Sequence, residues 1–201
     1  MIKAIIFDIG GVVYLGKMED SFSKLNFLLG LKEGSINDLF LRNREPLLIG
    51  KMTSKEFCIL VTHTFSLNFS SKEVHDLWIR AWAETSGLNK ELVTLIKKLK
   101  TKYKVACISD ATSFDVELDN KTGIKELFKP YVNSCDFGMT KSNPKLFGLV
   151  LKKLNVNPKE CIFIDDRPKH FGIPKELGAK TIPFENNLQL FKELRELGVI
   201  I

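Results

Sequence analysis

The chain has 201 residues, of which 44% are hydrophobic and 27% are charged, and its formal net charge is +6 at pH 7. This length can bury one substantial core with room for a small second lobe, which excludes two large domains. The longest apolar stretches reach only about half a membrane span, and residues 1–7 lack the basic segment and cleavage site of a signal peptide. We therefore expect a cytoplasmic protein that has no membrane partner.

The chain opens with an apolar run that reads AIIF and ends at Asp8. A continuous apolar run of this kind predicts a strand that is buried on both faces, as in a parallel sheet. Gly10 and Gly11 follow, and glycine lets the backbone turn sharply and approach a ligand closely. The first strand is therefore expected to end at a ligand-binding turn.

The next segment, residues 19–83, has helical periodicity, because its apolar residues recur at three to four positions. Thr53 with Glu56, and Ser70 with Glu73, have the spacing of a capping box and mark the starts of two helices. This pattern predicts an all-helical insertion of about four helices after the first strand.

From residue 89 onward, strands and helices are expected to alternate. Apolar runs predict strands at 105–108, 131–134, 161–164 and 180–182. Amphipathic segments predict helices at 89–100, 112–120, 144–154, 168–177 and 188–197. Such alternation is typical of βαβ units. The predicted fold class is therefore α/β, with a Rossmann-type parallel sheet in a three-layer core and a small helical lobe inserted after the first strand.

Five lysines in residues 97–104 form the densest basic segment of the chain. They fall at the end of an expected helix and the start of an expected strand, where cations stabilise the helix C-terminus and stay in water. We therefore expect a solvated basic face and no nucleic-acid partner.

The four cysteines show no CxxC spacing anywhere in the chain. Cys107 and Cys161 lie inside expected central strands, and Cys58 lies in a helical stretch. Buried thiols behave as small apolar side chains, so we expect free cysteines and neither disulfides nor a zinc site.

Polar residues stand where three of the expected strands end. Asp8 follows AIIF, Ser109 follows VACI, and Asp165 with Asp166 follows CIFI, while Lys141 lies between the second and third of these runs. The carboxyl ends of parallel strands meet at one edge of a doubly wound sheet, so we expect these residues to share a crevice. Carboxylates suit a hard cation such as Mg²⁺, and a hydroxyl and an ammonium suit a phosphoryl group. The sequence therefore predicts a site for magnesium and phosphate.

Four motifs that contain these residues are FDIGGVV, CISDA, KSNPKLFGLVLKKL and FIDDRPKH. In this order they resemble the motifs of the haloacid dehalogenase (HAD) superfamily of hydrolases, over nearly the whole chain. The stretch from KSNPKLF to ELGAKTI is similar to the branch typified by sugar-phosphate phosphatases and the epoxide hydrolase N-terminal domain. The resemblance implies a HAD-like α/β core at residues 1–13 and 87–201, with a helical cap at 14–86 that closes over the substrate.

The same resemblance implies roles for the residues around the phosphoryl group. Asp8 would attack phosphorus and form an aspartyl-phosphate that water then hydrolyses. Ser109 would hydrogen-bond a phosphoryl oxygen, and Lys141 would neutralise charge on that group and on Asp8. Asp110 lies beside the phosphate, where relatives usually carry Asn, so it is either a phosphate-site residue, a relocated acid or an outward-facing helix cap.

A magnesium site is also implied by the resemblance. The metal would bind Asp8, the main-chain carbonyl of Gly10 and Asp165, with Asp166 supporting it through a water molecule. Most phosphatases of the family carry an Asp at position 10 as general acid and base, and the loss of such a group typically costs about a hundred- to ten-thousandfold in rate. Gly10 is therefore the main departure from the family pattern.

Three further residues are expected near the edges of the site. His170 stands where relatives usually carry Asn, and we expect it at the surface or behind the site rather than as a proton carrier. In the cap, Arg44 and Lys51 are the candidates for contact with an anionic or hydroxylated substrate.

These observations predict a magnesium-dependent phosphatase for a small phosphorylated metabolite, with a sugar phosphate favoured. Gly10 and Asp110 support one alternative, a phosphate-binding or regulatory module with impaired catalysis. A second alternative is a metal-independent 2-haloacid dehalogenase, which uses the same nucleophile and has no acid two residues later. The paired acids at 165 and 166 favour a metal and so favour the phosphatase. The sequence leaves open whether the protein is a monomer or a dimer.

Overall fold

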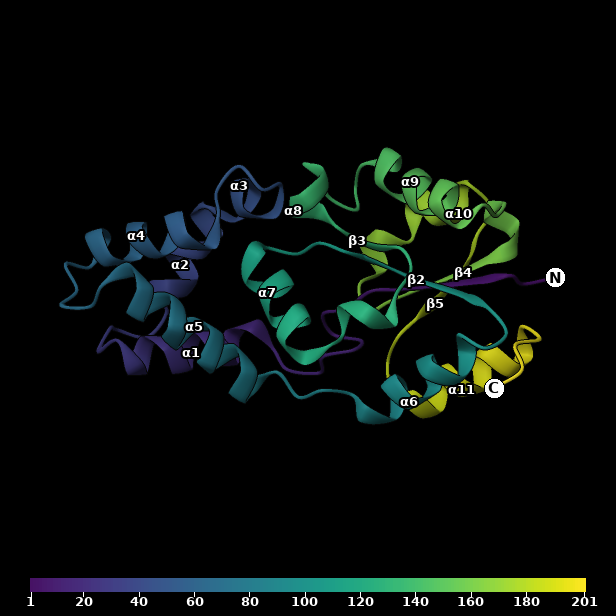
Figure 1. Cartoon of the computed structure of the whole chain (residues 1–201), viewed down its shortest axis with the longest axis horizontal. Helices are drawn as coiled ribbons and strands as arrows, with labels where there is room; N and C mark the ends of the chain where they lie inside the picture. Colours follow the sequence, from purple (N-terminus) through teal and green to yellow (C-terminus); the bar gives the residue numbers. More distant parts are fainter.

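Figure 1 shows the computed structural model of the chain, which describes all 201 residues. A parallel sheet of five strands lies at one end of an elongated molecule, and its strand order is β3-β2-β1-β4-β5. The strands are β1 (Ala4–Phe7), β2 (Lys104–Ser109), β3 (Tyr131–Asn133), β4 (Cys161–Asp165) and β5 (Lys180–Pro183). The prediction of a parallel α/β sheet is therefore confirmed.

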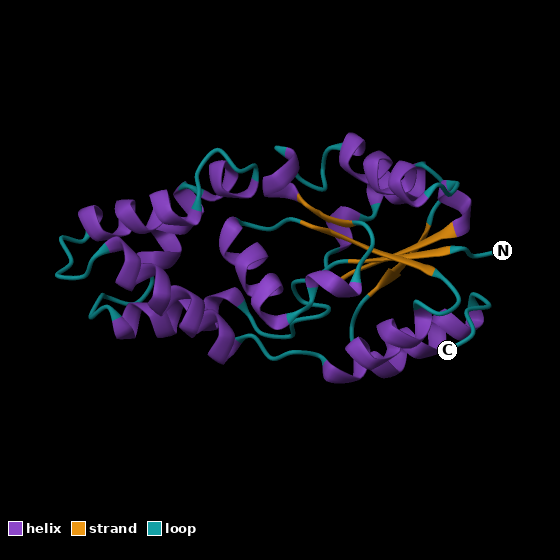
Figure 2. Cartoon of the chain, in the orientation of Figure 1, coloured by secondary structure: helices purple, strands orange, loops and turns teal.

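Helices cover both faces of this sheet (Figure 2). They are α6 (Lys90–Leu99), α7 (Ser113–Thr122), α8 (Ser134–Phe137), α9 (Pro144–Leu154), α10 (Gly172–Glu176) and α11 (Asn187–Glu196). In β1, Ile5 and Phe7 pack with α6 and α11, whereas Ala4 and Ile6 pack with α9. Because alternate residues of one strand face opposite layers, β1 is buried throughout, as its unbroken apolar run predicts.

Five helices fill the chain between β1 and α6. They are α1 (Met18–Leu28), α2 (Ser35–Arg42), α3 (Arg44–Leu48), α4 (Ser54–Thr64) and α5 (Ser71–Thr85). These helices, called the helical lobe below, form a hydrophobic cluster of their own. The prediction of about four helices missed the break after α2. Pro46 explains the break, because its ring excludes the carbonyl of Arg42 from a continuous helix.

Both expected capping boxes are present at the starts of α4 and α5. The Thr53 hydroxyl accepts from the Glu56 main chain at 3.2 Å while the Glu56 carboxylate accepts from the Thr53 main chain at 2.8 Å. Ser70 and Glu73 make the same reciprocal pair. Each box satisfies two main-chain donors that a helix otherwise leaves free.

Two segments after the second strand differ from expectation. The expected strand at 131–134 ends at Asn133, whose side chain accepts from the Asp136 main chain and starts α8. The expected helix at 168–177 is split into a 3₁₀ turn, η3 (Pro168–His170), and the short α10. Pro174 explains this split, because it cannot donate to the carbonyl of His170 and its ring clashes there.

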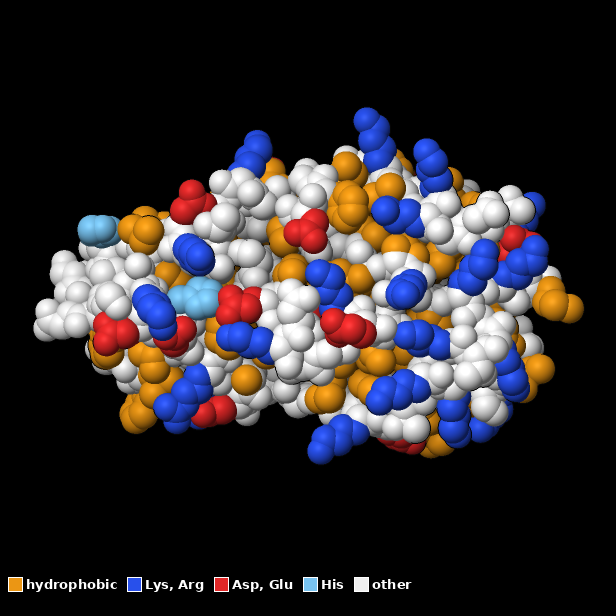
Figure 3. Space-filling view, in the orientation of Figure 1, with side chains coloured by type: hydrophobic (Ala, Val, Ile, Leu, Met, Phe, Trp, Pro, Cys, Tyr) orange, Lys and Arg blue, Asp and Glu red, His pale blue; other side chains and the backbone are white.

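The basic side chains discussed above lie on the surface, whereas most of the cysteines lie in the core. Lys and Arg side chains are spread over the face in Figure 3, with Asp and Glu side chains between them. All five lysines of residues 97–104 are exposed. The four cysteines are free, as expected, and three of them are buried. No helix combines the length and apolar character that a membrane span requires.

Beneath the carboxyl edge of the sheet, Asp119 of α7 is buried and accepts a hydrogen bond from the Tyr131 hydroxyl at 2.6 Å. Burial raises the pKa of Asp119 from 3.8 to about 7, although the hydrogen bond from Tyr131 opposes the shift. The folded chain thus keeps a proton that the unfolded chain releases between about pH 4 and pH 7. Asp119 therefore lowers stability as the pH rises through that window.

Asp119→Asn, which mimics the protonated side chain, is expected to raise the thermal midpoint at pH 8 by about 4 °C or more and to change it little at pH 4. Thermal unfolding of both proteins at the two pH values measures this difference. Asp38→Asn is the matched control, because Asp38 is exposed and unpaired on α2. An equal shift at both pH values for Asp119→Asn would contradict the assignment.

Candidate active site

The residues that follow β1, β2 and β4 lie at the edge of the sheet that faces the helical lobe (Figure 1). Asp8 extends β1 by one more pairing, because its main-chain nitrogen donates to the carbonyl of Ile164 in β4 at 2.8 Å. This pairing places Asp8 next to Asp165, the last residue of β4. Ser109 ends β2 on the other side of β1 and is 5% exposed. The strand ends therefore converge as the sequence predicts.

Lys141 joins two of these acids. Its Nζ lies 2.8 Å from Asp8 Oδ2 and 2.7 Å from Asp165 Oδ2. The side chains of all three residues are at most 6% exposed. Asn143, the N-cap of α9, and Pro144 at its first position fix the chain just after Lys141. A buried ammonium requires a carboxylate partner, and Lys141 has two.

Asp165 has its acceptor positions filled by protein donors. The main-chain nitrogen of Arg167 donates to Oδ1 at 2.8 Å. His170 Nδ1 lies 3.0 Å from Oδ1 and 2.9 Å from Oδ2, and Lys141 donates to Oδ2. Burial alone would raise the pKa of Asp165, but the hydrogen bonds from His170 and Lys141 hold it below its usual value. Asp165 is therefore an ionised carboxylate that accepts hydrogen bonds from Lys141, His170 and Arg167.

The pKa of Asp8, the candidate nucleophile, is shifted in the opposite direction from that of Asp165. Burial raises its pKa from 3.8 to about 6, even though Lys141 lowers it, and the nearby charge of Asp165 adds to the rise. Its Oδ1 accepts from the main chain of Ile9 at 2.7 Å. The carboxylates of Asp8, Asp165 and Asp166 face only one buried ammonium, so the site has an excess of negative charge.

Asp166 is the acid with a free oxygen. Its Oδ1 is buried and has no hydrogen-bond partner, which is costly unless a ligand satisfies it. Arg167 Nε lies 3.8 Å from the other oxygen. Gly11 has a φ of +76°, and a Cβ there would overlap the Asp166 carboxylate. The turn after β1 thus requires glycine both for its backbone conformation and for this close approach.

The structure distinguishes between the positions that the sequence left open for Asp110 and His170. Asp110 Oδ1 accepts from the main-chain nitrogen of Lys141 at 2.7 Å, so it is not an outward-facing helix cap. Thr112, which forms a capping box with Asp115, caps α7 instead. His170 is 8% exposed and contacts Asp165, so of the two expected positions, at the surface or behind the site, the structure has the second. Its position five residues after Asp165, in the motif FIDDRPKH, was the only available signal.

The two candidate substrate residues lie in the helical lobe and away from these contacts. Arg44 is the first residue of α3, and Lys51 is exposed shortly after that helix. Neither forms an ion pair or hydrogen bond with the residues around Asp8. The segment between them approaches the core, because a Cβ at Gly50 would overlap the main chain of Cys135.

The site thus combines a parallel sheet, an aspartate after the first strand and a buried lysine that contacts this aspartate. The family model of haloacid dehalogenase-like hydrolases matches residues 2–172. The chain therefore belongs to the haloacid dehalogenase-like hydrolase family, which confirms the resemblance in its motifs.

Known proteins are similar to the chain over nearly its whole length. The chain is 28% identical over 207 residues to D-ribitol-5-phosphate phosphatase of Bacteroides thetaiotaomicron, covering 96% of this chain and 97% of that protein. It is 24% identical to bifunctional epoxide hydrolase 2 of Sus scrofa over 98% of its own length, but it spans only 39% of that protein. Its fold matches a HAD family enzyme of Bacteroides thetaiotaomicron solved with magnesium and inorganic phosphate, with a TM-score of 0.78, 22% identity and coverage of 95% and 100%.

Proposed function

We propose that the protein is a magnesium-dependent phosphatase that hydrolyses a small phosphorylated metabolite through an aspartyl-phosphate on Asp8. The observation that carries this proposal is the buried Lys141, which bridges Asp8 and Asp165 beside the unpartnered oxygen of Asp166. The phosphatase among the relatives supports the reaction, and its substrate favours a sugar or polyol phosphate.

The donors at the carboxyl edge fit a small divalent cation. They are carboxylate oxygens in excess of positive charge, and one of them is buried without a partner. We propose that Asp8, the main-chain carbonyl of Gly10 and Asp166 would hold Mg²⁺. The sequence favoured Asp165 as the direct ligand, but its oxygens already accept from Lys141, His170 and Arg167. When bound, Mg²⁺ would neutralise charge on the phosphoryl oxygens.

Asp8, Ser109 and Lys141 have separate roles in the proposed phosphoryl transfer. A carboxylate oxygen of Asp8 attacks phosphorus in line as the bond from phosphorus to the leaving oxygen breaks. Ser109 donates a hydrogen bond to a phosphoryl oxygen, and Lys141 Nζ stabilises the charge that both reactants carry. Water then attacks the phosphorus of the aspartyl-phosphate, which releases phosphate and restores Asp8.

Gly10 supplies no proton to the leaving oxygen, so solvent water or a group on the substrate supplies it in this scheme. We assign Asp110 to positioning Lys141 rather than to proton transfer, because its Oδ1 accepts from the main-chain nitrogen of Lys141 at 2.7 Å. The reaction is therefore fastest for substrates whose leaving group needs little protonation.

We propose that the helical lobe, within residues 14–86, acts as a cap over this edge. Phe114 of α7 inserts into the cluster of the lobe and stacks on Trp78, with ring centroids 4.3 Å apart. The Ser113 hydroxyl accepts from the Ser54 main chain at 2.7 Å. Both contacts attach the lobe to the segment that follows Ser109. Arg44 and Lys51 remain our candidates for substrate contact from this cap.

A panel of phosphorylated metabolites tests the proposed function. Phosphate release with Mg²⁺ is expected for at least one sugar or polyol phosphate, and a chelator is expected to lower the rate by at least about a hundredfold until Mg²⁺ is restored. Activity that survives full chelation would contradict the proposal. Halide release from a 2-haloacid without metal would favour the dehalogenase, and no turnover on either panel would favour a binding module.

A further inference from the structure

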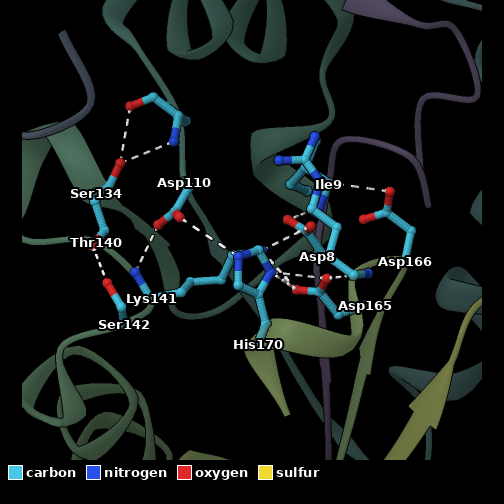
Figure 4. Close-up of polar contacts among 12 residues, drawn as sticks. Asp8, Ile9, Asp110, Ser134, Thr140, Lys141, Ser142, Asp165, Asp166 and His170 are labelled. Carbon is cyan, nitrogen blue, oxygen red and sulfur yellow. Dashed lines mark hydrogen bonds and ion pairs between the residues drawn. The ribbon is translucent and has the colours of Figure 1, made fainter. Parts of the chain in front are cut away.

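A closed ring of polar contacts connects the two ends of Lys141 (Figure 4). At one end, the Lys141 main-chain nitrogen donates to Asp110 Oδ1 at 2.7 Å. At the other end, Lys141 Nζ donates to Asp165 Oδ2 at 2.7 Å. His170 completes the ring. Its Nδ1 lies at hydrogen-bond distance from Asp165 Oδ2, 2.9 Å, and its Nε2 lies 3.9 Å from Asp110 Oδ2, which is the distance of an ion pair with a protonated imidazole.

The members of this ring come from four separate segments of the chain. Asp110 follows β2, Lys141 precedes α9, Asp165 ends β4, and His170 ends η3. The hydroxyl of Ser134 strengthens the β2 end, because it accepts from the main-chain nitrogen of Ala111 at 2.9 Å. The ring therefore connects the loop before α9 and the turn η3 to the ends of β2 and β4.

The ring opposes the natural flexibility of a lysine. Lysine has a long, flexible stem, and holding it in one conformation costs side-chain entropy. Lys141 Nζ must nevertheless stay between Asp8 and Asp165, where its side chain is 3% exposed. Contacts at the main chain and at the ammonium restrict both ends of the stem, and His170 couples the two contacts.

The same geometry argues against other roles for Asp110 and His170. Asp110 directs one oxygen to a main-chain donor and the other toward His170, so neither is directed at Asp8. Both ring nitrogens of His170 face carboxylates of the ring. The hydrogen bonds that both residues make therefore go to the chain around Lys141 and to Asp165, which favours a positioning role.

We propose that Asp110 and His170 are positioning residues that act as one unit to hold Lys141 Nζ at the nucleophile. This inference rests on the proposed role of Asp8, but the placement of Lys141 is measurable without turnover. Because the unit has two members, the loss of either one is expected to release most of the restraint, and the loss of the second is expected to add little.

The test uses Asp110→Ala, His170→Ala and the double variant, because an amide at either position could still hydrogen-bond the same partners. Acetic anhydride labels accessible lysines, and mass spectrometry gives the labelling rate at Lys141 relative to that at Lys145, which is exposed in the same chain. This measurement needs neither magnesium nor substrate. Labelling of Lys141 is expected to rise several-fold in each single variant and no further in the double variant.

Kinetics on the best substrate provide the second readout. Each single substitution is expected to lower kcat about tenfold with KM changed less than about threefold, and the double variant is expected to match the worse single variant. Lys169→Ala, at an exposed neighbour of His170, is the control and is expected to behave as the wild type in both readouts.

Two results would overturn the inference. If Lys141 is labelled in all three variants at the same rate as in the wild type, the ring does not hold the side chain, even if the thermal midpoints change. Multiplicative losses of kcat, near a hundredfold in the double variant, would show two independent residues. If no substrate is turned over by the wild type, the proposed function fails, but the labelling still decides whether the ring positions Lys141.

Discussion

Asp8→Asn is expected to lower kcat for phosphate release by about ten-thousandfold or more, because an amide cannot form the aspartyl-phosphate. The fold should survive the change. The amide oxygen can still accept from Ile9 or from Lys141, and Lys141 keeps its contact with Asp165. The substitution also removes one of three crowded negative charges, so the thermal midpoint is expected to stay the same or rise. Steady-state kinetics and thermal unfolding measure the two effects.

Asp38→Asn controls for an Asp to Asn change at an exposed position, and its kcat is expected to equal that of the wild type. A phosphatase rate in Asp8→Asn within about tenfold of the wild type would remove Asp8 from the reaction. Loss of activity together with a collapse of the thermal midpoint would instead assign Asp8 a structural role.

Gly10→Asp is expected to raise kcat about ten- to a hundredfold for substrates with a poor leaving group, because general acid and base catalysis contributes about a hundred- to ten-thousandfold. The position can accept a side chain, since no neighbouring heavy atom lies within 4 Å of where its Cβ would be. Its φ also lies outside the left-handed region that favours glycine, unlike that of Gly11. The main-chain carbonyl at position 10 is retained.

A comparison of substrates with different leaving groups distinguishes acid catalysis by Asp at position 10 from a general rise in kcat. The gain should be large for a sugar or polyol phosphate and small for p-nitrophenyl phosphate, whose leaving group needs no proton. Gly10→Asn has the same size without the acid and is expected to give no gain. Equal rates for Gly10→Asp and Gly10→Asn on every substrate would show that another group already supplies the proton.

The sheet and its polar edge were predictable from the sequence because each rests on a local pattern. The runs AIIF, VACI and CIFI are continuous and apolar, and a polar residue marks the end of each. The capping boxes at Thr53 and Ser70 were also predictable, since reciprocal hydrogen bonds over three residues need no tertiary contact.

The arrangement within the site depends on side-chain directions, which spacing does not determine. Asp165 and Asp166 are adjacent in sequence, so their side chains point in different directions, and only the structure shows that Asp165 meets Lys141 while Asp166 Oδ1 has no partner. Asp110 and His170 lie sixty residues apart and come together through the turn η3. Pro174 sets that turn by interrupting the helix expected at 168–177.

Phosphoryl transfer to Asp8 is tested most directly by trapping the intermediate. Wild-type protein is mixed with Mg²⁺ and a substrate that it turns over, quenched in acid and treated with borohydride, which reduces an aspartyl-phosphate to homoserine. Peptide mass spectrometry is expected to find homoserine at position 8 in the substrate-treated protein, and none without substrate or in Asp8→Asn. Sustained turnover with Asp8 unmodified in every quenched sample, or reduction at a different carboxylate such as Asp166, would contradict a mechanism that proceeds through Asp8.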